Sequence, residues 1–284
     1  MNIKTHFSIF FQDLAQGIVL DNAYDLYLRN RYIDYVDKFN INYISSQDID
    51  MNMLKFFPNI EFLTVPPDAE NLHALYNLKK LKGIEIFARC FDDLDLTKFE
   101  NLEYLLVQEQ PQNIHQLEHC KKLKHLKCSQ WDSTDVSDLK SICTLKSLEL
   151  EFCGKLQSLN GIGNLTILEK VSIIYCSKLR QIEELKGVKD SLKRLILEDC
   201  NKIEDLSTIA LLCNLEFLLL SSFQTRGVNK LPSLKFIREM PHLKEFLTDY
   251  KIEDGDLTPL LKVDKVDVLK FYRHYNLKEN AFSK

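Results

Sequence analysis

The side chains in this sequence most able to bind metal or act as nucleophiles belong to eight cysteines and seven histidines. The densest group of potential ligands is His115, His119, Cys120, His125 and Cys128. His115 and His119 are four residues apart, a spacing that places both on one face of a helix, as some zinc sites require. However, no Glu follows His115 as in the helical zinc-protease motif, and paired Cys-x-x-Cys motifs are absent. We therefore predict no metal and no cofactor.

Three further cysteines, Cys153, Cys176 and Cys200, recur 23 and 24 residues apart. Such a row could be a metal or redox ladder. Free cysteine also behaves as a small buried hydrophobe, and the sequence favours this packing interpretation. The N-terminal apolar stretch Phe7–Phe11 is too short for a secretion signal, so we expect a cytoplasmic protein with reduced thiols. Cys120, Cys143 and Cys213 each precede a predicted strand and are expected to pack where the chain turns into it.

The sequence carries no catalytic motif. It has 47 Leu but only 8 Gly; Gly161 and Gly163 lack the partners of a phosphate-binding loop, and no Gly-x-Ser-x-Gly elbow occurs. A net charge of −4 argues against nucleic-acid binding. No run of 18 apolar residues predicts a membrane span, and a composition of 45% hydrophobic residues argues against disorder. We predict that the protein is not an enzyme.

The leucines follow the pattern apolar-x-x-apolar-x-apolar at regular intervals. Eight clear copies are followed by two weaker ones, and successive copies begin 21 to 24 residues apart except for one interval of 28. The copies begin at Ile60, Leu81, Leu102, Leu123, Leu145, Leu168, Leu192, Leu215, Leu243 and Val266. The last three residues of each copy predict a short strand with one buried face, and the later apolar positions suit a short helical or 3₁₀ return.

This repeat resembles the leucine-rich-repeat family, whose unit is L-x-x-L-x-L-x-x-N/C. The copies that run from Leu145 to Cys153, Leu168 to Cys176 and Leu192 to Cys200 match the nine-residue motif in full. The short repeats are most similar to the internalin type or the cysteine-containing type. The resemblance implies an α/β solenoid: a curved horseshoe with a parallel concave sheet and short helical or 3₁₀ convex segments.

The predicted domain organisation follows from the extent of the repeat. Residues 1–56 are expected to form an N-terminal cap, helical for the most part, with a degenerate first strand near Ile41–Ile44, although an independent recognition domain is an alternative. Residues 57–276 form the solenoid, which Phe271–Tyr275 closes, and residues 277–284 form a C-terminal tail. The long interval holds an insertion, Phe223–Ser233, which we expect to protrude as a loop.

Between the core positions of each strand, the third, fifth and seventh positions of the motif must point out of the concave face. Their side chains are more apolar than a solvated face requires, and an exposed apolar patch rimmed by charges is typical of an interaction site. Alternatively, the insertion folds over the patch. The candidate partner-binding residues are Tyr104, Leu106, Glu149, Glu151, Lys170, Ile174, Tyr175, Arg194, Ile196, Phe217, Leu219 and Leu247. The second position is charged in every copy and is expected to be a solvated rim.

The favoured hypothesis is a non-enzymatic module that binds a protein partner on the concave face, since leucine-rich-repeat proteins mostly bind proteins. The protein is expected to be a monomer when free, with no nucleic-acid or membrane partner. The partner could be a toxin or an enzyme, which would make the chain a bacterial immunity or inhibitor protein. The alternative is an effector or scaffold that recruits substrate for an activity in the N-terminal segment.

Overall fold

A computed structural model describes residues 17–20, 43–46, 50–222 and 229–268 of the chain. The chain divides into two units, residues 1–130 and residues 131–284, which are considered separately. Most of the predicted cap, the segment Phe271–Tyr275 and the C-terminal tail lie outside the described residues. None of the described helices is long and apolar enough to cross a membrane.

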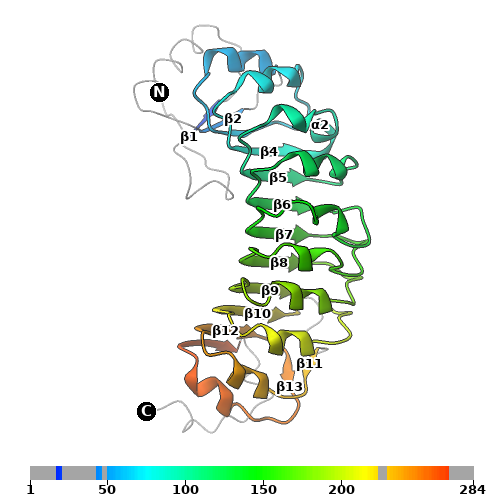
Figure 1. Ribbon diagram of the computed structural model, residues 1–284, viewed down its shortest axis with the longest axis vertical. Helices are drawn as coiled ribbons and strands as arrows, with labels where there is room; N and C mark the ends of the chain where they lie inside the picture. The colour runs from blue at the N-terminus through cyan, green and yellow to red at the C-terminus, as the bar shows by residue number, and fades with distance from the viewer. Residues whose placement is uncertain (1–16, 21–42, 47–49, 223–228, 269–284) are drawn as a thin grey trace. The chain divides into compact units, whose positions relative to one another are not determined.

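The first unit contains parallel strands that pair in chain order (Figure 1). The strands are β1 Gly17–Leu20, β2 Tyr43–Ser46, β3 Phe62–Thr64, β4 Gly83–Phe87, β5 Tyr104–Gln108 and β6 His125–Ser129. Short helices connect them: η1 Met51–Phe56, η2 Leu72–Asn77, α2 Ala88–Asp92, η3 Leu96–Lys98 and η4 Ile114–His119. Because β2 pairs with β3, the sheet begins before residue 57.

The second unit repeats this plan, and its main strands are also parallel. They are β7 Ser147–Glu151, β8 Lys170–Ile174, β9 Arg194–Glu198, β10 Phe217–Ser221, β12 Glu245–Thr248 and β14 Lys265–Val268. The 3₁₀ helices are η5 Ser137–Leu139, η6 Ile162–Asn164, η7 Glu183–Val188, η8 Ser207–Leu211, η10 Lys235–Glu239 and η11 Thr258–Lys262. These helices line one side of the sheet (Figure 1).

Each coil places its repeat leucines in register with those of the next coil. Leu148, Val171, Leu195 and Leu218 lie opposite one another on β7 to β10, and all are fully buried. Burying one such side chain is worth about 1.5–3 kcal/mol. A single turn cannot enclose these side chains, so stacking of neighbouring coils creates the core.

The turn before each strand also recurs. In most copies the first leucine donates its N–H to the carbonyl three residues earlier, as in Leu168 to Leu165 (2.8 Å) and Leu215 to Leu212 (3.1 Å). The earlier residue ends the preceding 3₁₀ helix in these two coils. Leu192 instead donates to the carbonyl four residues earlier, that of Val188 (2.9 Å). These local hydrogen bonds join the end of the helix to the start of the strand.

The predicted register of the last copy is wrong by three residues. Val266 lies opposite Phe246 of β12, not opposite Leu243, and Asp267 lies opposite Leu247. Val263 ends η11 in an extended conformation (ψ 126°), whereas the residues that end η8 and η10 have ψ of 61° and 78°. The chain therefore enters β14 directly, and the usual three-residue turn is missing. Both registers satisfy the apolar pattern, so the sequence could not choose between them.

The insertion in the long interval is only partly described. Its residues Lys230–Leu231 form β11, which pairs in parallel with β13, Lys251–Ile252, in a second small sheet. Residues 223–228 lie outside the described residues. The described end of the insertion is thus hydrogen-bonded, as β11, to the segment that follows β12.

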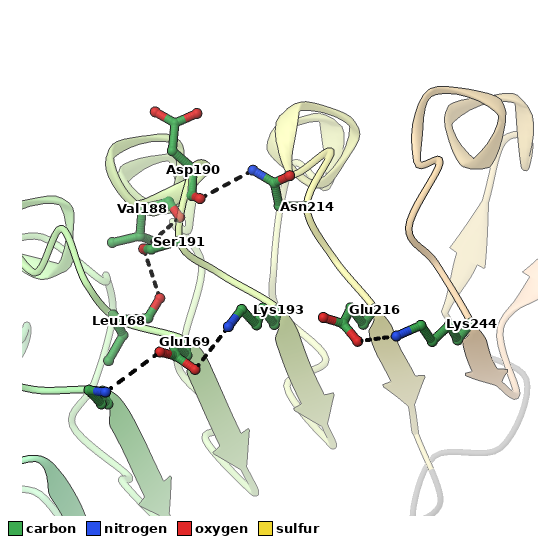
Figure 2. Close-up of polar contacts among 10 residues, drawn as sticks. Leu168, Glu169, Val188, Asp190, Ser191, Lys193, Asn214, Glu216 and Lys244 are labelled. Carbon is green, nitrogen blue, oxygen red and sulfur yellow. Dashed lines mark hydrogen bonds and ion pairs between the residues drawn. The ribbon is translucent and has the colours of Figure 1, made fainter.

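The charged second positions form ion pairs between adjacent coils, a role that the sequence analysis did not assign to them. In the second unit Glu169 lies between Lys193 (3.2 Å) and Lys146 (3.9 Å), and Lys244 pairs with Glu216 (2.5 Å; Figure 2). In the first unit, Lys82 pairs with Glu61 and Lys124 with Glu103. Charges of opposite sign one repeat apart favour the observed stacking register.

Small polar side chains join the same coils beside these pairs. The Ser191 hydroxyl donates to the Leu168 carbonyl (2.8 Å), and the Asn214 amide donates to the Asp190 carbonyl (3.2 Å; Figure 2). Each donor immediately precedes the first leucine of its copy. Backbone carbonyls at the turn of the preceding coil are satisfied in this way.

Gly161 and Gly163, which are predicted not to form a phosphate-binding loop, have structural roles instead. Gly161 has a positive φ of 98° at the start of η6. A Cβ at Gly187 on η7 would lie 2.5 Å from the Gly163 Cα and 2.7 Å from its carbonyl oxygen. The 3₁₀ segments η6 and η7 therefore approach closely because Gly163 and Gly187 lack side chains.

We predict that Gly187→Ala destabilises the protein by about 1–3 kcal/mol, because the added methyl must displace backbone. Gly154→Ala is the matched control, since a Cβ there meets nothing within 4 Å. The free energies of unfolding come from urea denaturation. Equal stability of the two variants would contradict the close-packing role.

We predict that Glu169→Lys lowers stability by at most about 1 kcal/mol per lost pair, because the partners are about half exposed and surface pairs are weak. The loss should shrink in high salt, and Lys146→Glu with Lys193→Glu should restore stability. Thermal unfolding of the unchanged protein, the Glu169→Lys variant and the triple variant, each at two salt concentrations, measures the loss of stability. A loss that neither salt nor the compensating changes reduce would mean that the ion pairs are not its cause.

Candidate protein-binding surface

The face of each sheet that points away from the leucine core is called here the open face. It carries the third, fifth and seventh positions of the motif because side chains alternate across a strand. In the second unit the fifth positions Ile196, Leu219 and Leu247 lie opposite one another on β9, β10 and β12. All three are half-buried. The structure thus brings these predicted residues together as one partly exposed aliphatic row.

The third-position residues beside this row are engaged with one another. The Arg194 guanidinium lies over the Phe217 ring, 4.1 Å from its centroid. Phe217 is only 8% exposed, whereas Arg194 is exposed. The expectation that Phe217 is an exposed anchor is therefore wrong, because its ring packs under the arginine. Sequence spacing gives the direction of a side chain but not what covers it.

An ion pair occupies the open face on β7 and β8. Lys170 lies 2.6 Å from Glu149, and these side chains are 32% and 21% exposed. The neighbouring positions Ser147 and Ser172 are buried. Two of the predicted charged residues, Lys170 and Glu149, are thus paired with each other within the protein.

The open face of the first unit carries aromatic residues. Tyr104 stacks on His125 with ring centroids 4.5 Å apart and an interplanar angle of 2°. Phe62 lies 5.8 Å from Tyr104 on its other side. Leu106 is only 6% exposed, so the prediction that it is available to a partner is wrong.

The ends of β7 to β9 carry an aromatic and acidic group that was only partly predicted. Glu151, Ile174 and Glu198 occupy the seventh position, and all are half-buried. At the eighth position Phe152 stacks on Tyr175, with ring centroids 4.8 Å apart and an interplanar angle of 15°. Phe152 is 54% exposed and was not among the predicted residues, although Tyr175 at the equivalent position of the next coil was.

The carboxylates in this group interact unfavourably. Burial raises the pKa of the Glu198 carboxyl, and the charges of Asp199, Asp249 and Glu151 raise it further. Burial also raises the pKa of the Asp249 carboxyl, although its carboxylate accepts the Ser222 N–H at 2.8 Å. The half-buried carboxylates of this group are those of Glu151 and Glu198, whereas Asp199 and Asp249 are buried.

The three recurring cysteines form a buried ladder beneath this edge. The Cys153, Cys176 and Cys200 thiols each donate to the carbonyl two residues earlier, at 3.3–3.4 Å. Cys153 also accepts the Trp131 N–H at 3.3 Å. These contacts agree with the packing interpretation, in which a small side chain satisfies the loop backbone.

The ladder thiols shift one another's pKa values in opposite directions. The neighbouring Cys176 thiol raises the pKa of Cys200, and burial raises it further. The neighbouring Cys153 and Cys200 thiols lower the pKa of Cys176. Since all three side chains are buried, none is available to a solvent oxidant or a substrate.

The expectation for the cysteines that precede strands is only partly correct. Cys120 is buried, and burial raises its pKa to about 12. Cys143 and Cys213 are exposed, contrary to the prediction. In these two coils the residue three before the strand motif, Ile142 or Leu212, faces the core, so the next residue points outward.

The cluster of histidines and cysteines between residues 115 and 128 is dispersed. His125 stacks on Tyr104, and Cys120 and Cys128 are buried. Within the described part of the chain, no three His, Cys, Asp or Glu side chains come together in a way that could hold a metal ion.

Parallel strands in constant register, one in each coil, joined by 3₁₀ segments over a leucine core, define a leucine-rich-repeat fold. The fold predicted from the repeat is confirmed. No protein-family model matches the sequence, and no curated protein matches it significantly. Its similarity to known proteins therefore lies in the structure.

Two solved structures from Listeria monocytogenes share this fold. The internalin InlF is 20% identical, with a TM-score of 0.50 over 79% of this chain and 71% of that one. The functional domain of InlJ, described as including a cysteine ladder, is 18% identical, with a TM-score of 0.53 over 80% of this chain and 48% of that one. The chain thus spans about half of the InlJ structure.

We predict that two of the eight thiols, Cys143 and Cys213, react rapidly with Ellman's reagent in the native protein, because the other six are buried. The remaining thiols should react only after denaturation. Cys143→Ser with Cys213→Ser should abolish the rapid phase, whereas Cys176→Ser should leave it unchanged. Rapid loss of a third thiol would contradict the buried ladder.

Proposed function

We propose that this protein is a non-enzymatic binding module that recognises a protein partner on the open face of its sheet. The observation that carries the proposal is the aliphatic row Ile196, Leu219 and Leu247, which is partly exposed on three adjacent strands. A contiguous apolar surface rimmed by charges is typical of an interaction site. The leucine-rich-repeat fold of the chain supports this function.

The finer proposal is that the partner is a toxin or an enzyme, which this chain inhibits in the cytoplasm. All eight cysteines are unpaired thiols, which fits a reducing compartment. If so, the captured partner should lose activity in the presence of the purified protein. A partner that keeps its full activity when saturated would exclude the inhibitor role and leave the binding role intact.

We predict that Ile196→Asp with Leu219→Asp abolishes partner capture, because a buried interface cannot accommodate two unpaired carboxylates. Capture is measured by cross-linking and mass spectrometry with native extract of the source cells. Leu211→Asp with Leu261→Asp is the matched control, because these leucines are 53% and 67% exposed on the 3₁₀ helices.

Circular dichroism must show that both double variants are folded. Capture by the control with loss in the open-face variant supports the proposal. Equal capture by both would mean that the partner binds elsewhere on the molecule.

A further inference from the structure

The stacked rings of Phe152 and Tyr175 stand at a position where the fold does not need aromatic residues. Both have left-handed backbone conformations, with φ of 57° and 56°. The equivalent residues of other copies, Glu109, Gln130 and Asp199, share this conformation but are polar. The left-handed region is unfavourable for bulky side chains and is best tolerated by Gly, Asn and Asp.

The hydrogen bonds at this turn come from the backbone. The Phe152 N–H donates to the Ile174 carbonyl, and the Tyr175 N–H donates to the Glu198 carbonyl, both at 2.9 Å. Any residue that adopts this conformation makes the same bonds. The exposed ring of Phe152 adds nothing to them, so its stability cost calls for a role outside folding.

At the strand ends the charge beside the two rings is acidic; the nearest basic residues along the chain, Lys155 and Lys178, come three residues later, and Lys155 is paired with Asp132. The seventh and eighth positions after β7, β8, β9, β10 and β12 contain four acidic residues and no Lys or Arg. These acidic residues are Glu151, Glu198, Asp199 and Asp249. The basic residues on the neighbouring third positions are already engaged, Lys170 with Glu149 and Arg194 with Phe217.

We propose that the Phe152–Tyr175 pair, flanked by Glu151 and Glu198, is a docking site for an arginine in a basic segment of the protein partner. This inference rests on the proposed function and names the chemistry of the partner. A guanidinium stacks on aromatic faces and is more weakly hydrated than an ammonium. Its fork of N–H donors also matches a carboxylate. A wholly apolar segment would desolvate the acidic side chains without bringing a positive charge to them.

The test uses fluorescent peptides and the full chain. The probe is a short peptide of alternating Gly and Arg, compared with versions carrying Lys, Leu or Glu in place of Arg, and binding is measured by fluorescence anisotropy. We expect the Arg peptide to bind more tightly than the Lys peptide, and the Leu and Glu peptides not to bind. Absence of Arg-peptide binding, or equal binding of the Lys peptide, would overturn the proposal.

Two double variants separate the contributions of the rings and the carboxylates. Phe152→Asn with Tyr175→Asn removes the rings but keeps a residue type that tolerates the left-handed conformation, and Glu151→Gln with Glu198→Gln removes the charges. Each should weaken Arg-peptide binding about tenfold. The ring variant should also unfold at the same or a higher temperature, because the strain is relieved.

Matched controls test whether the attraction is specific. Glu183→Gln with Glu239→Gln removes two exposed carboxylates on η7 and η10, and Leu211→Asn removes an exposed apolar side chain. These changes should leave binding within about twofold. If the control charge variant weakens binding as much as Glu151→Gln with Glu198→Gln, attraction to net charge alone explains the result and the inference fails.

Failure here is distinguishable from failure of the proposed function. If Ile196→Asp with Leu219→Asp abolishes partner capture but the ring variant does not alter it, the binding face stands and the arginine site is wrong. If neither variant alters capture, the open face itself is not the binding surface.

Discussion

No coil of this chain can bury its own apolar side chains, and the rest of the structure depends on this constraint. A strand of five residues followed by a 3₁₀ turn exposes one leucine-lined edge on each side. Stacking in parallel register covers both edges, so residues such as Leu148 and Val171 become fully buried only together. The core is therefore shared between neighbours, and its register must be the same at every step.

Polar interactions between coils maintain this register, although they contribute little to the buried apolar area. Glu169 lies between lysines of the two adjacent coils, and the Asn214 side chain reaches the turn of the coil before it. The ladder thiols satisfy carbonyls at the opposite end of the strands. Close contact of Gly163 with Gly187 sets the spacing of the 3₁₀ segments. Each device acts between neighbouring coils, as the quasi-one-dimensional architecture requires.

The same constraint leaves the other face of the sheet free for recognition. Most of its residues lie outside the leucine core, although Leu106 and Phe217 are buried on this face. Some of them satisfy one another, as Lys170 and Glu149 do, while the aliphatic row and the Phe152–Tyr175 pair keep part of their surface exposed. Large aromatic side chains in a left-handed turn are a cost to stability. Such costs are typical of positions retained for function.

The sequence alone determined the fold, because the leucine period specifies which side chains face the core. It also determined the directions of the strand side chains, the aliphatic row Ile196, Leu219 and Leu247, and the recurrence of the ladder cysteines. Only the tertiary structure decided the cover over Phe217, the pairing of second-position charges, the stacking of Phe152 on Tyr175 and the shortened entry to β14. These features depend on contacts between residues 20 or more positions apart. A repeat pattern gives the direction of each side chain, whereas its neighbour is set by how adjacent coils pack.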